Sequence, residues 1–187
     1  MFLKSDDADL FVTSFGSGPR TIVAHGGWVG SGELWQQPFE QLSRRWRTVT
    51  YDHLGTGATR FIEGCKANFE ATMEMFVNAC TPDDHCEAER GWGKQIVMRS
   101  DDPSAVQLME CLEPVQLEDR LSQIQLPTLL IHGSRDIITP IASSQNLAQQ
   151  RPNSKLVTIE GAGHVPTVTR PAEVVRAIEE FFATDTL

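Results

Sequence analysis

The segment Pro127-Thr-Leu-Leu-Ile-His-Gly-Ser-Arg-Asp-Ile-Ile-Thr-Pro140 is followed, after a helix-like run, by Lys155-Leu-Val-Thr-Ile-Glu-Gly-Ala-Gly-His-Val-Pro166. Each segment contains a short apolar run, over 128–131 and 156–159, and runs of this length are typical of buried parallel strands. Between them, Thr139 and Pro140 fit a helix cap followed by a proline in the first helical turn. The stretch therefore predicts a strand, a helix and a second strand.

Two residues with catalytic chemistry follow the ends of these predicted strands. Asp136 comes after the first strand, and His164 comes after the second. In open parallel sheets, functional groups gather beyond the carboxyl ends of the strands. The predicted topology can therefore bring this carboxylate and this imidazole together.

The pattern Gly-Ser-Arg-Asp-x-Ile-x-Pro, followed by Glu-Gly-Ala-Gly-His-x-Pro, resembles the acid and histidine segments of the α/β-hydrolase superfamily. That superfamily places its acid before its histidine in the chain, as here. The resemblance implies that Asp136 orients the imidazole and that His164 is a general base. It also implies an α/β fold, namely a reduced α/β-hydrolase fold with a mostly parallel sheet, flanking helices and a helical cap.

The amino-terminal part carries a second segment of this resemblance. A predicted strand over 21–24 runs into His25-Gly-Gly-Trp28, and a predicted helix over 34–45 and a strand over 47–51 follow. In the superfamily, backbone amides of such a His-Gly-Gly turn form half of the oxyanion hole, which implies Gly27 or Trp28 as the donor. A strand-to-helix turn that needs glycine explains the same residues, and both interpretations can hold. Residues 9–16 predict an antiparallel edge strand.

The sequence departs from the superfamily after Gly57. An ordinary member continues through two helices and two strands, roughly sixty residues, which include the Gly-x-Ser-x-Gly nucleophile elbow. That block is missing here. Ser17, Ser31 and Ser134 stand beside glycine without forming an elbow, and Cys65 follows no strand-like run. The nucleophile is therefore unknown: a serine or cysteine that the pattern does not locate, or a water activated by the histidine.

Residues 61–124 are predicted to form the helical cap, or crossover, between an amino-terminal core segment, 1–60, and a carboxyl-terminal one, 125–187. Within this part, helices are expected at about 67–79 and 103–112, with Asp102 as the cap of the second. Loss of the block would leave two strand edges unpaired. The two edges could pair directly, or a second chain could fill the gap, which makes a homodimer possible.

Composition limits the partners and the location. The 187 residues include 16 Lys and Arg against 25 Asp and Glu, and the formal net charge of -9 argues against nucleic-acid and anionic-membrane partners. No apolar run approaches membrane-spanning length, and the amino terminus lacks a secretory leader pattern, so a cytoplasmic location is expected.

A cysteine pair, Cys80 and Cys86, flanks His85 without a second ligand pair, so no metal is predicted, and no cofactor either. Free thiols are favoured, and a loop disulfide stays open.

These observations lead to one function and two alternatives. The favoured function is weak hydrolysis of a small ester, lactone or related acyl substrate under a helical cap. One alternative is a non-catalytic protein that binds a small ligand on a hydrolase scaffold, which the missing elbow favours. The other is a truncated homologue of a working enzyme.

A carboxyl-terminal helix from Pro171, with an apolar face, is expected to close the domain.

Overall fold

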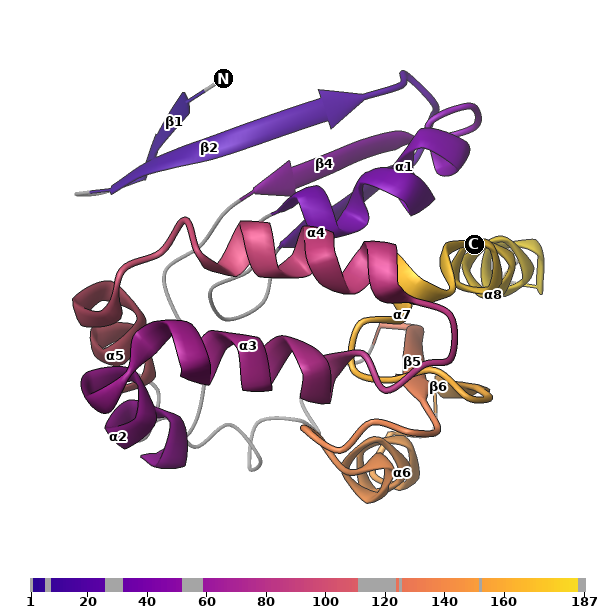
Figure 1. Cartoon of the computed structure of the whole chain (residues 1–187). Coiled ribbons are helices and arrows are strands. Elements are labelled where there is room, and N and C mark those ends of the chain that lie inside the picture. The colour runs from indigo at the N-terminus through magenta and orange to yellow at the C-terminus, as the bar shows by residue number, and fades with distance from the viewer. Residues whose placement is uncertain are drawn as a thin grey trace. The chain divides into compact units, whose positions relative to one another are not determined.

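The computed structural model describes residues 2–5, 8–25, 32–51, 59–110, 124, 126–151 and 153–184. Its elements follow one another along the chain as strands, helices and strands (Figure 1). They are β1 (Phe2–Ser5), β2 (Ala8–Phe15), β3 (Thr21–His25), the 3-10 helix η1 (Gly32–Trp35), α1 (Gln36–Leu42), β4 (Arg47–Tyr51), α2 (Thr59–Ala67), α3 (Phe69–Cys80), α4 (Glu87–Val97), α5 (Asp102–Glu110), β5 (Thr128–Gly133), α6 (Ile141–Gln149), β6 (Ser154–Ile159), α7 (Pro166–Thr169) and α8 (Pro171–Thr184).

The chain divides into two compact units. One comprises Met1–Met75 and Gly91–Pro114, and the other comprises Phe76–Arg90 and Val115–Leu187. The predicted threefold division at 60 and 124 stays a prediction. None of the helices in the described ranges is long and apolar enough to cross a membrane.

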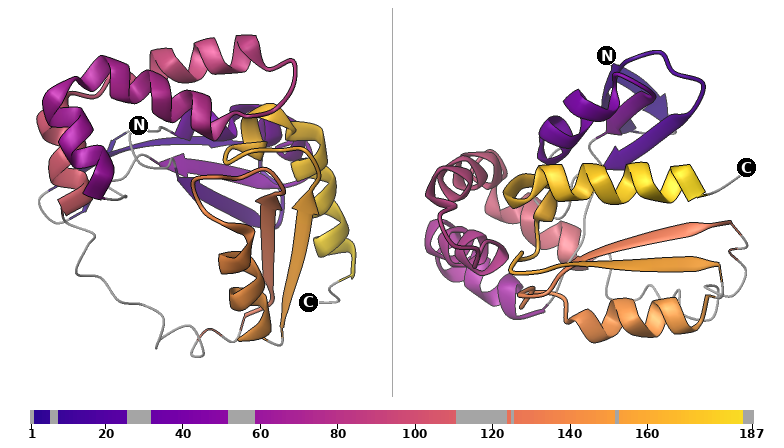
Figure 2. Two further views of the ribbon diagram at one scale, coloured as in Figure 1. Left: turned by 60° about the horizontal axis from the view of Figure 1, so that its bottom comes forward. Right: turned by 90° about the vertical axis from the view of Figure 1, so that its right-hand side faces the viewer.

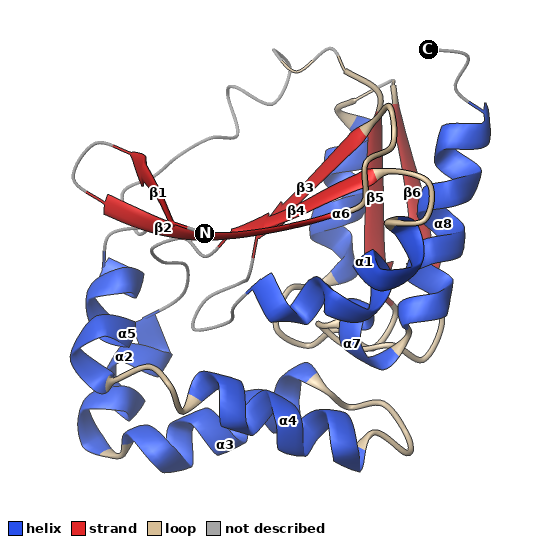
Figure 3. Cartoon of the chain, turned by 90° about the horizontal axis from the view of Figure 1, so that it is seen from above, coloured by secondary structure: helices blue, strands red, loops and turns tan. Residues whose placement is uncertain are grey.

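The first unit contains a four-stranded sheet with the order β1-β2-β4-β3. Strand β2 runs antiparallel to β1 and β4, whereas β3 runs parallel to β4 with Val23 opposite Val49 (Figure 3). The expected antiparallel strand over 9–16 is therefore present as β2. It is not an edge strand, because β1 pairs with it along its outer side, and no local pattern predicted that pairing.

The apolar residues after β3 form two short helices instead of the single predicted helix over 34–45. The 3-10 helix η1 precedes α1, and Pro38 lies in the first turn of α1, where a missing amide is tolerated. Phe39 and Leu42 are almost completely buried, and the rings of Trp35 and Phe39 lie 5.4 Å apart. A helix with a buried face is therefore present in the predicted range, although the α-helix itself covers only Gln36–Leu42.

The described part of the segment between β4 and β5, residues 59–110, forms four helices, two more than were predicted in detail. Helix α5 packs on α2 within the first unit (Figure 3). Its cap is Asp101 rather than the predicted Asp102, because the Asp101 carboxylate accepts the Ser104 amide hydrogen bond at 2.7 Å. Helix α4 was not expected, since Gly91 and Gly93 weaken its helical pattern. Burial of its last turn, including Ile96, stabilises it nevertheless.

The second unit contains the predicted strand, helix and strand. Strands β5 and β6 are parallel, with Ile131 opposite Val157. Helices α6 and α8 cover opposite faces of this pair (Figure 2). The expected helix from Pro171 is confirmed as α8, and Val174 and Ile178 on its apolar face are buried.

The described strands form a four-stranded sheet in the first unit and a two-stranded sheet in the second. Direct pairing of the two strand edges and a second chain that fills the gap both stay predictions.

Candidate active site

The structure brings together the two side chains that the sequence singled out. Nδ1 of His164 lies 2.8 Å from Oδ2 of Asp136. A carboxylate oxygen accepts hydrogen bonds, so this contact assigns the proton to Nδ1 and leaves a lone pair on Nε2. The His164 side chain is 32% exposed, whereas that of Asp136 is 5% exposed. The imidazole is thus accessible and its acidic partner is buried.

The second oxygen of Asp136 is bound by its own loop. Oδ1 accepts hydrogen bonds from the backbone amides of Ile138 at 2.8 Å and Thr139 at 2.9 Å. An aspartate that bonds amides two and three positions ahead stabilises a tight turn. The same side chain therefore shapes the loop after β5 and leaves Oδ2 aimed at the histidine.

A second histidine, which the sequence analysis did not select, lies against the same carboxylate. Nε2 of His132 is 3.0 Å from the carbonyl oxygen of Thr139 and 3.4 Å from Oδ2 of Asp136, while Nδ1 is 2.8 Å from Oγ of Ser144. A carbonyl only accepts, so Nε2 carries a proton, and Nδ1 of a neutral ring then accepts the hydrogen bond of the Ser144 hydroxyl. His132 is buried, and its ring lies against Oδ2 of Asp136, the same oxygen that His164 contacts. The sequence contained one signal for His132, which is that this histidine directly follows the apolar run over 128–131.

The loop that carries His164 approaches the end of β5 very closely. A side chain at Gly133 would come within 2.1 Å of the Gly163 carbonyl oxygen, so only glycine fits there. Gly161 has φ +74°, a left-handed turn that also favours glycine. The glycines of the Glu-Gly-Ala-Gly-His pattern therefore have a steric reason in this fold.

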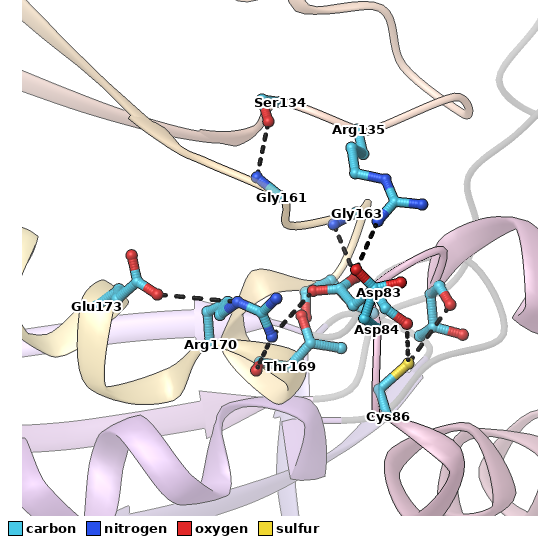
Figure 4. Close-up of polar contacts among 12 residues, drawn as sticks. Asp83, Asp84, Cys86, Ser134, Arg135, Gly161, Gly163, Thr169, Arg170 and Glu173 are labelled. Carbon is cyan, nitrogen blue, oxygen red and sulfur yellow. Dashed lines mark hydrogen bonds and ion pairs between the residues drawn. The ribbon is translucent and has the colours of Figure 1, made fainter.

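The hydroxyl of Ser134, one of the serines considered as a nucleophile, already makes two hydrogen bonds in this turn. Its Oγ accepts the amide hydrogen bond of Gly161 at 2.9 Å (Figure 4). The same hydroxyl donates to Oε1 of Glu160 at 3.0 Å. The hydroxyl joins the loops that follow β5 and β6. We conclude that its role is to connect these loops.

The three described cysteines, Cys65, Cys80 and Cys86, are free and buried. Burial, followed by the negative charge of Asp136, raises the pKa of the Cys80 thiol to about 12. A thiol with that pKa is protonated at neutral pH and is a poor nucleophile. Burial also raises the pKa of Cys65 and of Cys86. None of these three residues has the properties of an activated cysteine.

Other predicted site residues lie outside the described ranges. Gly27 and Trp28, the expected oxyanion donors, belong to this group, as does Ser31. Within those ranges, no group of three or more His, Cys, Asp or Glu side chains is arranged to hold a metal ion. The geometry in hand is therefore an acid and histidine pair, suited to proton transfer.

Comparisons with known proteins show which proteins this chain resembles. A family model for α/β-hydrolases, described as "TAP-like protein", matches residues 104–187. The pimeloyl-[acyl-carrier protein] methyl ester esterase of Nitrosomonas europaea is 27% identical over 125 residues, which cover 65% of this chain and 50% of the esterase. The chain spans about half of the length, or less, of the curated relatives that it matches.

Solved structures show the fold. An esterase from Exiguobacterium antarcticum superposes with a TM-score of 0.88 at 14% identity, covering 98% of this chain and 99% of the esterase. The enol-lactonase from Burkholderia xenovorans gives a TM-score of 0.87 at 13% identity, with 98% and 100% of the two chains covered. At these identities the likeness establishes the architecture.

Proposed function

We propose, from the premise that this chain belongs to the α/β-hydrolase superfamily, that it hydrolyses a small ester, lactone or related acyl substrate with low turnover. The observation that carries the proposal is the 2.8 Å contact between Nδ1 of His164 and the buried carboxylate of Asp136. The names of an esterase relative and of an enol-lactonase with the same fold agree with an acyl substrate.

In this function His164 is the general base and Asp136 is its partner. With the proton on Nδ1, the free Nε2 lone pair takes a proton from a water or from a serine or cysteine hydroxyl or thiol as that group attacks the substrate carbonyl. The imidazolium, stabilised by Asp136, then returns the proton to the leaving alcohol oxygen when the carbonyl re-forms. Backbone amides at Gly27 or Trp28 would hold the negative oxygen in between.

Removal of an elbow nucleophile removes most of the rate of such an enzyme, since the remaining acceleration comes from binding and the oxyanion hole. We therefore expect slow turnover if water is the nucleophile. The missing elbow also favours the alternative function, a non-catalytic or truncated homologue that binds a small ligand. The predicted cytoplasmic location and a homodimer joined through strand edges belong to the same proposal.

Hydrolysis of a series of short-chain p-nitrophenyl esters tests the function. The purified chain is compared with His164→Ala and with His85→Ala, a matched control that removes an exposed histidine of the same unit. We expect turnover that disappears in His164→Ala and persists in His85→Ala. Mass spectrometry after treatment with a fluorophosphonate probe then separates a protein nucleophile, which gives one covalent adduct, from an activated water, which gives none.

Equal rates in all three proteins, together with no adduct, would overturn the enzymatic function and leave the ligand-binding alternative. That alternative predicts retained binding of a non-hydrolysable acyl analogue, such as a short-chain ketone, which calorimetry measures directly.

A further inference from the structure

Two consecutive backbone amides of the histidine loop are bound by a segment from a distant part of the chain. The carbonyl oxygen of Cys80 accepts the amide hydrogen bond of His164 at 2.8 Å. A carboxylate oxygen of Asp83, Oδ2, accepts the amide hydrogen bond of Gly163 at 2.9 Å (Figure 4). Both contacts lie within the second unit. The segment that follows α3 thus holds the backbone on which the imidazole stands.

The steric fit between these two segments is close. A Cβ atom at Gly163 would lie 2.3 Å from Cδ of Pro82 and 2.5 Å from the carbonyl oxygen of Cys80. Real Cβ atoms do not approach other atoms so closely, so Gly163 is the residue that allows the two backbones to meet. The amide contacts therefore belong to a packed interface.

The carboxylate of Asp83 also reaches the chain on the other side of His164. Its Oδ1 lies 3.4 Å from Nη1 of Arg170, which follows α7. The Asp83 side chain has no exposed surface, and Arg170 is 28% exposed. A buried carboxylate needs a positive partner and hydrogen-bond donors, and Arg170 and the Gly163 amide supply both. One side chain thus accepts a hydrogen bond from the residue before His164 and forms an ion pair with a residue after it.

We propose that Asp83, with Arg170, is a positioning residue for His164: it clamps the loop from both sides and so fixes the direction in which the imidazole meets Asp136. The inference rests on the proposed function only in assigning the histidine a catalytic role. Asp83 acts through the backbone of Gly163, and it needs no contact with a substrate. The ring of His164 should lose its fixed hydrogen bond when the clamp is removed, even in a chain that stays folded.

Nitrogen NMR of chains labelled with ¹⁵N-histidine tests this directly, because the shifts of the two ring nitrogens report which one carries the proton. Asp83→Ala removes both contacts of the carboxylate, whereas Asp83→Asn keeps an oxygen acceptor for the Gly163 amide. Asp84→Ala is the matched control: it removes the adjacent acid, which is 83% exposed and pairs with Arg135 at 3.5 Å. His132 is an internal reporter of folding, since Thr139 and Ser144 fix its tautomer independently of Asp83.

We expect the wild-type chain, Asp83→Asn and Asp84→Ala to show His164 with a fixed Nδ1 proton. In Asp83→Ala the two ring shifts of His164 should move to the average of two exchanging tautomers, while His132 is unchanged. If Asp83→Ala also loses the His132 signature, the double variant Asp83→Ala/Arg170→Met is measured instead, because it leaves no unpaired buried charge.

A His164 signature that is unaltered in a folded Asp83→Ala chain, or in the folded double variant, would overturn the proposal. Ester hydrolysis is measured on the same samples to keep the two proposals apart. A wild-type chain without turnover sinks the proposed function, yet the NMR comparison still decides whether Asp83 positions the imidazole. In an active chain, we expect Asp83→Ala to lower kcat at least tenfold and Asp83→Asn to restore most of it.

Discussion

Nδ1 of His164 lies 2.8 Å from Oδ2 of Asp136, although 28 positions separate the two residues in the chain. The contact depends on two parallel strands that end together, because Gly133 at the end of β5 lies opposite Ile159 at the end of β6. Each loop then brings its functional side chain to the same edge of the sheet.

Replacement of Asp136 by Asn should remove most of the hydrolytic activity. An amide that points its NH₂ group at His164 would favour the wrong tautomer, and the corresponding change in a serine-protease triad lowers kcat by about 10⁴-fold. We expect a loss on the order of 10³- to 10⁴-fold in kcat for p-nitrophenyl esters. Asp84→Asn, which removes an exposed charge in the same unit, should retain the wild-type rate. Wild-type activity in Asp136→Asn would contradict the assigned role.

The buried thiol of Cys80 should make stability depend on alkaline pH. Its pKa is raised from 9.0 to about 12, first by burial and then by Asp136, so the unfolded chain releases this proton at lower pH than the folded chain. The stabilisation is complete below pH 9 and is lost as the pH rises toward 12. This single group should lower the free energy of unfolding by on the order of 1 kcal/mol per pH unit in that window.

Urea unfolding at several values between pH 8 and pH 11 measures this effect as the difference between the wild-type chain and Cys80→Ala. Subtracting the variant removes the contributions of lysine and tyrosine, which both chains share. Parallel curves for the two proteins would show that Cys80 titrates at its ordinary pKa and is not held protonated by the fold.

Two glycine substitutions should change stability in opposite directions. Gly163→Ala places a Cβ atom 2.3 Å from Cδ of Pro82, and the overpacking should destabilise the fold by about 1–3 kcal/mol. Gly91→Ala lies in α4, where the new Cβ would have no atom within 4 Å apart from its chain neighbours and its own helix backbone. It should stabilise the fold by about 0.5–1 kcal/mol, because alanine loses less backbone entropy in a helix. Chemical denaturation of both variants measures the contrast, and a neutral Gly163→Ala would refute the close packing.

Val23 provides a test of the proposed homodimer. It lies on β3, the last strand of the four-stranded sheet among the described strands, and its side chain is 60% exposed. Lysine on an edge strand opposes pairing with another chain. Sedimentation velocity should therefore show a dimer for the wild-type chain and a monomer for Val23→Lys. A wild-type monomer over the accessible concentrations would exclude pairing through this edge.

Local sequence patterns predicted the elements of the second unit well. Apolar runs over 128–131 and 156–159 became β5 and β6, and the apolar positions after Pro171 became α8, because strand and helix periodicities depend on neighbouring residues. The prediction failed where local signals were weak. Helix α4 carries two glycines and forms through tertiary burial, and the cap of α5 moved by one residue to Asp101.

The sequence by itself determined that Asp136 and His164 follow two parallel strands, because residue type and spacing along one short stretch contain that information. Only the tertiary structure decided what supports them. Asp83 meets Gly163 across 80 positions of the chain, and no periodicity links the two residues. His132 is likewise a partner of Asp136 only through the tertiary structure, because the conformation of the loop after β5 places the carboxylate against the histidine ring. Such contacts arise from the closure of the fold, which brings distant groups together and requires each buried charge to find a partner.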